Sequence, residues 1–149
     1  MSYLLPNLGC DLLLDADGDL ALSVTGDLAL TPRGTTCLLQ DIAHLLETLP
    51  GDLFSHEEYG AGIGRLFGES YRAGFVQHVE RAVRDALVND PSVAPRLLSE
   101  TVKVEMERFS DTELSVSISA RAISDDQVIP LNLVWQYGLD DVSRVTERA

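Results

Sequence analysis

The residues best able to do chemistry stand together in one short stretch, His56-Glu57-Glu58-Tyr59-Gly60. A zinc-protease motif opens with the same His-Glu pair but needs a second histidine where Gly60 stands, so only one ligand and the glutamate remain. Catalytic zinc takes about three protein ligands at defined geometry. The other histidines, His44 and His78, fall on two predicted helices, and no spacing links them to His56. We therefore predict no metal site.

The acidic residues of this stretch suggest a second chemistry, the hydrolysis of a glycosidic bond. Glu57 and Glu58, with Asp52 or Glu69, would supply the carboxylates. A glycosidase holds an acid and a base or nucleophile about 5 to 9 Å apart across a cleft. Adjacent glutamates point in different directions and cannot flank one bond. We predict no catalytic residue, and a hydrolase remains only as the alternative.

The glycine-rich continuation, Gly60-Ala61-Gly62-Ile63-Gly64, begins like a phosphate-binding loop. The GxGxxG pattern does not close, because Arg65 or Phe67 stands where the last glycine belongs, and no strand precedes the loop. Close backbone packing explains these glycines better. We predict no cofactor and no small-molecule substrate.

Three alternating aspartates near the N-terminus, Asp15, Asp17 and Asp19, invite a calcium site. The spacing fails, because Leu20 replaces the loop glycine and Gly26 replaces the final glutamate. A hairpin turn accounts for them better, since aspartate and glycine favour tight turns.

Composition restricts the partners. The chain has 149 residues and a net charge of −13, which argues against nucleic acid and anionic lipid, because both are bound through Lys and Arg. No stretch approaches the roughly 18 consecutive apolar residues that span a bilayer, and the acidic start of the chain does not resemble a signal peptide. Cys10 and Cys37 lack motif spacing, which suits a reducing cytoplasm.

The N-terminal part predicts a β-hairpin. Residues 18–22, Gly-Asp-Leu-Ala-Leu, recur at residues 26–30, and residues 10–14 supply a first strand. A turn pair before alternating apolar residues is typical of short strands joined by tight turns. Residues 1–9 are expected to form an extended arm, with Pro6 and Gly9 as breakers.

Two amphipathic helices follow. The first has a leucine-rich stripe at helical spacing (Leu38, Ile42, Leu45, Leu46), with Thr35 or Thr36 as its N-cap and an end near Thr48, before Pro50-Gly51. After a short helical turn at residues 63–67, the second spans residues 70–89. Its stripe also has helical spacing (Phe75, Val76, Val79, Val83, Ala86, Leu87), and Asp90-Pro91 ends it.

The last third predicts a three-stranded antiparallel meander. Apolar and polar residues alternate over residues 102–107 and 114–119, and again from Ile129 to Trp135. Pro130 suggests that the third strand is an edge or begins there. Residues 138–149 are predicted to be a loose tail. The chain is thus expected to be one α+β domain over residues 1–149, with helices on one face of the sheet.

The order of these features resembles the baseplate wedge proteins of contractile phage tails, a gpW-like family with a counterpart in type VI secretion baseplates. The resemblance runs from about Asp11 to Trp135. It is carried by the Gly-Asp-Leu repeats, the first helix with Gln40, the Glu58-Tyr59-Gly60 loop, the second helix, and a Pro-Arg pair before a meander. Some members are labelled tail lysozyme, which is the source of the alternative, a peptidoglycan hydrolase.

The resemblance implies where partners bind. The family has Glu-Pro-Arg after the second helix; here the match is Ala94-Pro95-Arg96, without the glutamate, or else Asp90-Pro91-Ser92. It implies that Pro95 and Arg96, with Tyr59 and Gly60 of the loop, contribute to partner binding. The implied partners are other wedge proteins and the tail sheath and tube proteins.

The implied function is structural. The resemblance suggests a non-enzymatic component of a phage or prophage-derived baseplate, which joins wedge proteins to the tube and sheath and templates sheath assembly. It would be assembled in the bacterial cytoplasm and end in the virion tail baseplate. Strand addition at an open sheet edge is a suitable mechanism, and residues 128–136 or the first hairpin are the predicted edge.

Overall fold

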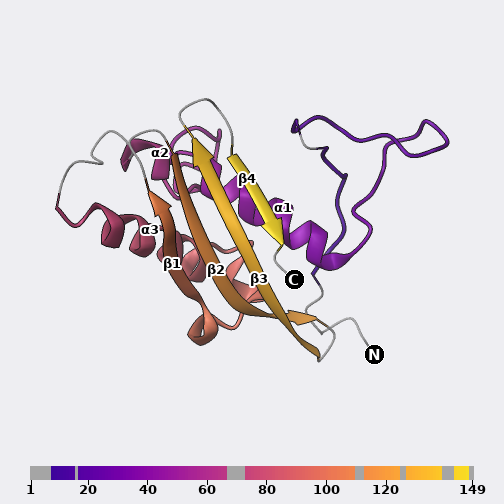
Figure 1. Ribbon diagram of the computed structural model, residues 1–149. Helices are drawn as coiled ribbons and strands as arrows, with labels where there is room; N and C mark the ends of the chain where they lie inside the picture. The colour runs from indigo at the N-terminus through magenta and orange to yellow at the C-terminus, as the bar shows by residue number, and fades with distance from the viewer. Residues whose placement is uncertain are drawn as a thin grey trace.

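The computed structural model describes residues 8–15, 17–66, 73–109, 113–124, 127–138 and 143–147. Helices pack on one face of a four-stranded antiparallel sheet, and a small N-terminal projection stands away from both (Figure 1). The α+β class and the two main helices are confirmed. The helical segments are α1 (Gly34–Glu47), α2 (Ile63–Leu66) and α3 (Phe75–Asn89), with short 3₁₀ turns at η3 (Ala94–Arg96) and η4 (Ser99–Thr101).

The apolar stripes place α1 and α3 as predicted, but the helix starts differ. The predicted N-caps Thr35 and Thr36 are wrong, because α1 already begins at Gly34, and Arg33 precedes it without a side-chain cap. The second helix begins at Phe75, because Gly74 has a left-handed φ of 83°; residues 70–72 of the predicted helix lie outside the described residues. Both ends agree with the prediction, at Glu47 and at Asn89 before Pro91.

The sheet runs β1 (Lys103–Phe109), β2 (Glu113–Ser124), β3 (Gln127–Gly138) and β4 (Ser143–Glu147), in that order. The first three strands form the predicted meander, and residues 127–138 of β3 pair along the whole of β2. The predicted loose tail is wrong at residues 143–147, which form β4 and pair with residues 133–137. Its other residues, 139–142 and 148–149, lie outside the described residues.

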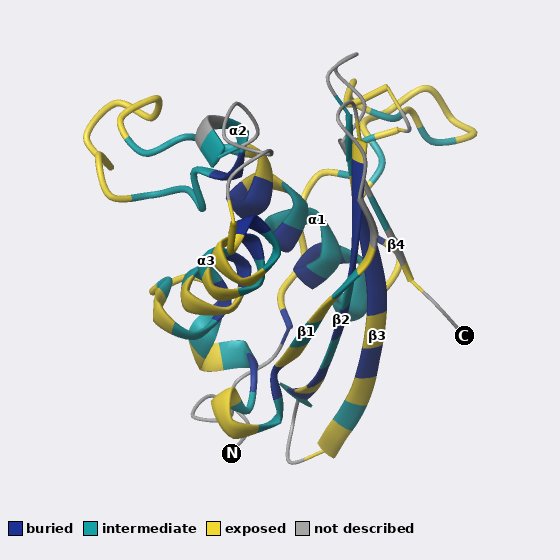
Figure 2. Ribbon diagram, turned by 60° about the vertical axis from the view of Figure 1, so that its left-hand side comes forward, coloured by how far each residue is buried: buried dark blue, intermediate teal, exposed yellow. Residues whose placement is uncertain are grey.

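The core lies between the helices and the inner face of the sheet, as the buried residues in Figure 2 show. Alternation in β2 and β3 sends Val116, Ile118, Leu133 and Trp135 inward. On α1, three leucines of the apolar stripe are at most 1% exposed: Leu38, Leu45 and Leu46. Trp135 is completely buried. Within the described ranges, no helix combines the length and apolar composition that crossing a bilayer requires.

The N-terminal projection is more regular than a single hairpin. Three extended segments around Leu13, Ala21 and Ala29 pair in a closed triangle: the Leu13 amide donates to Ala29, Ala29 to Ala21, and Ala21 to Leu13, at 2.8–2.9 Å. Single antiparallel bridges join each pair of segments. We call residues 11–31 the N-terminal knob. The predicted tight turns are present, and the eight-residue repeat has a third copy at residues 11–14.

The predicted N-terminal arm is only partly described. Residues 1–7 lie outside the described residues. Leu8 is buried, with 2% of its side chain exposed, so it is not part of a loose arm. It packs against the start of α1, where the absence of a side chain at Gly34 makes room: a Cβ there would lie 2.7 Å from the Cβ of Leu8.

Candidate partner-binding site

The glycine loop is built onto the C-terminal end of α1. The last carbonyls of a helix lack partners within the helix and must find them elsewhere. Here the Ala61 amide donates to the carbonyl of Leu45 at 2.9 Å, and the Gly62 amide donates to that of Thr48 at 3.3 Å. The loop therefore closes the helix end rather than forming a separate lobe.

Gly60 makes this close approach possible. Its φ is +120°, and a Cβ there would overlap the carbonyl oxygen of Thr48 and lie 2.8 Å from the carbonyl carbon. Side chains at such positive φ are strained. Gly60 completes neither the zinc motif nor the phosphate-loop motif. It is required because the loop packs closely against the end of α1.

Tyr59 stands beside Gly60 with its side chain half-buried against the core. Burial, together with the nearby negative charges of Asp90, Asp41 and Glu47, raises the pKa of its hydroxyl to about 12. The phenol is therefore protonated at neutral pH. It is an apolar ring with a polar tip, the type of side chain that is enriched in protein interfaces.

Arg96 is the most connected side chain of the region. It forms an ion pair with Asp41 of α1 at 2.7 Å, donates from Nη1 to the carbonyl of Leu8 at 3.0 Å, and donates from Nε to that of Ser92 at 3.0 Å. Only 13% of the Arg96 side chain and 28% of that of Asp41 are exposed. One guanidinium thus fastens α1, the turn after α3 and the segment before the knob.

The turn that carries Arg96 is held by Asp90. Its carboxylate accepts the amides of Ser92 and Val93 at 3.0 and 3.1 Å, and Pro95 lies within the first positions of η3. Ala94 stands where the resembled motif has glutamate. The acid that pairs with Arg96 comes instead from α1, 55 positions earlier (96 − 41), as Asp41.

The four residues singled out from sequence thus gather around α1 and the turn after α3. We call Asp41, Tyr59, Gly60, Pro95 and Arg96 the α1–η3 corner. Sequence reasoning missed Asp41, whose only signal was a charged residue off the apolar stripe of α1. Because Asp41 and Arg96 are far apart in the sequence, no local spacing predicts that they pair.

The catalytic candidates that the structure describes do not form a recognisable site, and Glu69 lies outside the described residues. His56, Glu57 and Glu58 are exposed on the loop, and among the described residues no group of three or more His, Cys, Asp or Glu side chains could hold a metal. The Asp15 carboxylate accepts the amides of Asp17 and Asp19 at 2.9 and 3.0 Å, which is the predicted turn.

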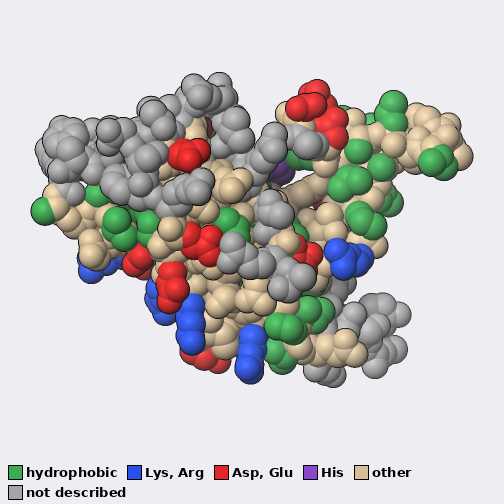
Figure 3. Space-filling model, in the orientation of Figure 1, with side chains coloured by type: hydrophobic (Ala, Val, Ile, Leu, Met, Phe, Trp, Pro, Cys, Tyr) green, Lys and Arg blue, Asp and Glu red, His purple; other side chains and the backbone are tan. Residues whose placement is uncertain are grey.

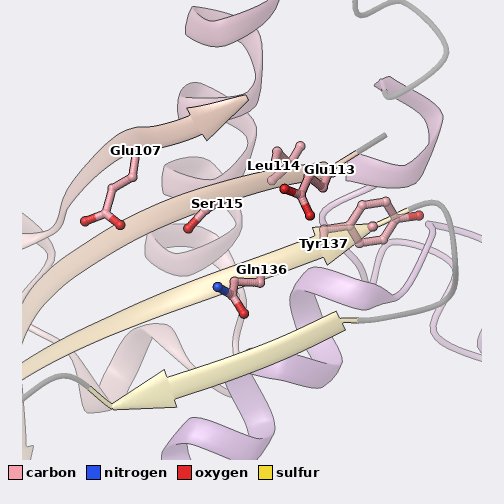
Figure 4. Close-up of a pocket in the computed structure, with 7 residues that line it drawn as sticks. Glu107, Glu113, Leu114, Ser115, Gln136 and Tyr137 are labelled. Atoms are coloured by element: carbon pink, nitrogen blue, oxygen red, sulfur yellow. The ribbon is translucent and has the colours of Figure 1, made fainter. Parts of the chain in front are cut away.

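A hollow of about 470 Å³ does contain two carboxylates, but neither belongs to the glycine loop (Figure 4). Glu107 of β1 and Glu113 of β2 line it with Ser115 of β2 and Gln136 and Tyr137 of β3. These residues come from adjacent strands near one end of the sheet. Glu57 and Glu58 are not among them.

The comparisons with known proteins give one match. A family model described as baseplate wedge protein gp25 matches residues 33–127. The matched region contains α1, the glycine loop, α3, the Arg96 turn, β1 and β2, and it begins after the knob. Neither the search of curated proteins nor that of solved structures finds a match.

Proposed function

The chain belongs to the family of the baseplate wedge protein gp25, and from this we propose that it is a non-enzymatic structural component of a contractile tail baseplate. The family indicates a structural role in a phage or secretion baseplate and contact with other baseplate components. Our proposal is more specific: the protein joins wedge proteins to the tube and sheath and templates the first sheath subunits. It is assembled in the bacterial cytoplasm before it becomes part of the baseplate.

The observation that carries the templating role is an open edge in β3. Strand β4 covers residues 133–137 only, so our prediction that all of residues 128–136 form the edge is wrong for its second half. Residues 127–132 pair with β2 and have no partner strand among the described residues on their other side. An incoming strand can bind there in line with β4, through backbone hydrogen bonds.

The opposite side of the sheet is less suitable for strand addition. Glu80 of α3 reaches β1 and accepts the amide of Met106 at 3.0 Å, so a side chain already occupies part of that edge. At the open half of β3, Pro130 lies opposite Arg121 and has no amide to donate. A proline in an edge limits pairing between identical edges, which favours a chosen partner over self-association.

We assign the α1–η3 corner to wedge-protein binding. Support comes from its chemistry: Tyr59 offers a protonated hydroxyl and part of a ring, and nearby Asp90 and Glu47 are acceptors for a partner's donors. Pro95 and Arg96 hold this surface in shape, since the three contacts of Arg96 are internal. Gly60 keeps the loop against α1.

Amide hydrogen exchange tests the templating role. Purified sheath protein from the same gene cluster is added, and protection is measured peptide by peptide. We expect new protection in residues 127–132, with residues 103–109 of β1 as the internal reference. Protection confined to β1, or none in the sheet while sheath binding is verified independently, would reject the proposed edge.

The hydrolase alternative has its own assay. We expect purified protein to leave peptidoglycan intact in a cell-wall lysis assay. Lysis that disappears in Glu57→Gln or Glu58→Gln would overturn the non-enzymatic assignment.

A further inference from the structure

We propose that the N-terminal knob, residues 11–31, is a second docking element. It inserts leucine side chains into an apolar pocket, rimmed by Lys and Arg, on another protein of the same assembly. The knob precedes the region that matches the wedge family, residues 33–127. Its contacts are therefore additional to those of the wedge body and of the β3 edge.

The knob exposes apolar side chains that a free protein would normally bury. Among the described residues, it holds six of the nine exposed large hydrophobic side chains: Leu12, Leu20, Leu22, Val24, Leu28 and Leu30. Leu22 and Leu30 are 67% and 60% exposed. Figure 3 shows hydrophobic side chains spread over this projection. A concentration of exposed apolar side chains on one small element favours an interaction site.

Five of the six bridge-forming leucines are exposed, whereas Leu14 and the central residues of the three segments are half-buried. Leu13, Ala21 and Ala29 use their amides and carbonyls in the closed triangle, and the residues on either side of each are the bridge-forming leucines. Each segment is too short to present the row of backbone groups that strand addition uses. The knob thus binds through side chains, which removes the first hairpin as an edge for sheath strands.

The knob is held in a fixed position on the body. Gln40 of α1 donates to the carbonyl of Leu12 at 3.1 Å and accepts the amide of Leu14 at 2.8 Å. Within the knob, the hydroxyl of the buried Thr31 accepts the amide of Asp11 at 3.2 Å and so joins the two ends of the knob. A binding element that is ordered beforehand loses less entropy on association, so these contacts favour recognition.

Charge selects the partner. Residues 8–31 contain five aspartates (Asp11, Asp15, Asp17, Asp19, Asp27) and no Lys, Arg or His. An apolar surface surrounded by carboxylates is complementary to an apolar pocket with a basic rim. A second copy of this chain is a poor partner, because the net charge of −13 makes copies repel one another.

The test measures binding of the purified full-length chain to each purified wedge, sheath and tube protein of the same gene cluster. We expect one of them to bind the wild type, and the variant Leu22→Asp/Leu30→Asp to bind it about 100-fold more weakly. The matched control is Leu53→Asp, at an exposed leucine that lies outside both the knob and the α1–η3 corner; it should bind like the wild type.

A charge variant keeps the proposal testable if the leucine variant disturbs the knob. Asp17→Lys/Asp27→Lys leaves every leucine in place and should weaken binding about tenfold at low salt, with the difference shrinking as salt rises. Amide exchange at Ala21 and Ala29 verifies that the triangle is intact in both variants.

Three outcomes would overturn the proposal. One is that both knob variants bind all of these proteins as the wild type does. Another is that none of the proteins binds the wild type through the knob. The last is that light scattering detects a dimer of the chain alone that Leu22→Asp/Leu30→Asp dissolves. Exchange at residues 127–132 reports separately on the β3 edge, so failure of one proposal is distinguishable from failure of the other.

Discussion

The N-terminal knob and the α/β body are both rich in leucine, yet they treat it in opposite ways. In the body, Leu38, Leu45 and Leu46 lie on one helix face with 0–1% of each side chain exposed, because a sheet covers that face. In the knob, Leu22 and Leu30 alternate outward, and more than half of each is exposed. The same residue type forms a core where an element covers it and a candidate binding surface where none does.

The difference extends to what holds each region together. The folding free energy of the body comes mainly from the removal of apolar surface from water. The knob is too small to bury its leucines, and it relies on the backbone triangle, aspartate turns and the Gln40 anchor. Apolar truncations should therefore destabilise the body and leave the knob's contribution to folding almost unchanged.

The largest expected effect comes from matched leucine truncations. Leu45→Ala should lower the free energy of unfolding by about 2 to 5 kcal/mol, because it leaves a cavity between α1 and the sheet. Leu22→Ala should change it by no more than about 0.5 kcal/mol, as for other exposed positions. Urea denaturation measures both. Equal losses would mean that the knob's leucines belong to the folding core, which would break the comparison.

Matched glycine substitutions should give the next largest effect. Gly60→Ala adds a Cβ that overlaps the end of α1 and should cost at least about 3 kcal/mol, since left-handed strain adds about 1 to 2 kcal/mol to the overlap. Gly26→Ala in the knob has a φ of +88° but nothing within 4 Å, so only the strain of about 1 to 2 kcal/mol applies. Similar losses in thermal and urea unfolding would show that packing at Gly60 matters little.

Matched arginine substitutions test the contact between Arg96 and the Leu8 segment, which connects the knob to the body. Arg96→Ala should cost about 2 to 3 kcal/mol, less than a fully buried ion pair, because Asp41 is 28% exposed. Arg33→Ala removes an exposed pair with Glu147 at 3.5 Å and should cost at most about 1 kcal/mol. In the Arg96 variant, amide exchange should also become faster near Leu8. An unchanged Leu8 region would assign the loss to α1 and η3 alone.

The elements with strong periodicity were predictable, because their patterns report which face is covered. The stripes of α1 and α3 and the alternation in β2 and β3 gave the correct elements and the ends of both helices, whereas the helix starts and the full lengths of the strands were not predicted. Strand β4 was missed because its sequence, Ser-Arg-Val-Thr-Glu, has one apolar residue, Val145. Its pairing with the half of β3 beside Trp135, rather than its own composition, makes it a strand.

The candidate site was predictable only as a set of unusual residues. Gly60 attracted attention as a failed catalytic position, and the reason for the glycine is a backbone contact with Thr48 that no motif encodes. Arg96 was selected through a resemblance, but its partner Asp41 depends on how α1 packs beside the turn after α3. Such contacts follow from tertiary packing and have no signature in local spacing.

The smallest expected effect is a difference in reactivity between the two cysteines, one just before the knob and the other in α1. Cys10 precedes the knob and is exposed, whereas Cys37 in α1 is buried. Burial raises the pKa of the Cys37 thiol, the charge of Asp41 raises it further, and nearby Arg96 opposes both. Because the thiolate is the nucleophile, a raised pKa leaves less of it at a given pH.

Iodoacetamide at pH 7.5, followed by peptide mass spectrometry, should therefore modify Cys10 at least about tenfold faster than Cys37. Labelling of Cys37 should accelerate as the pH rises above 9, the ordinary pKa of the thiol, since burial shifts its ionisation upward. If Cys37 reacts as fast as Cys10 in the wild type, the segment before the knob does not stay closed over α1. The knob would then lack the fixed position that its proposed docking requires.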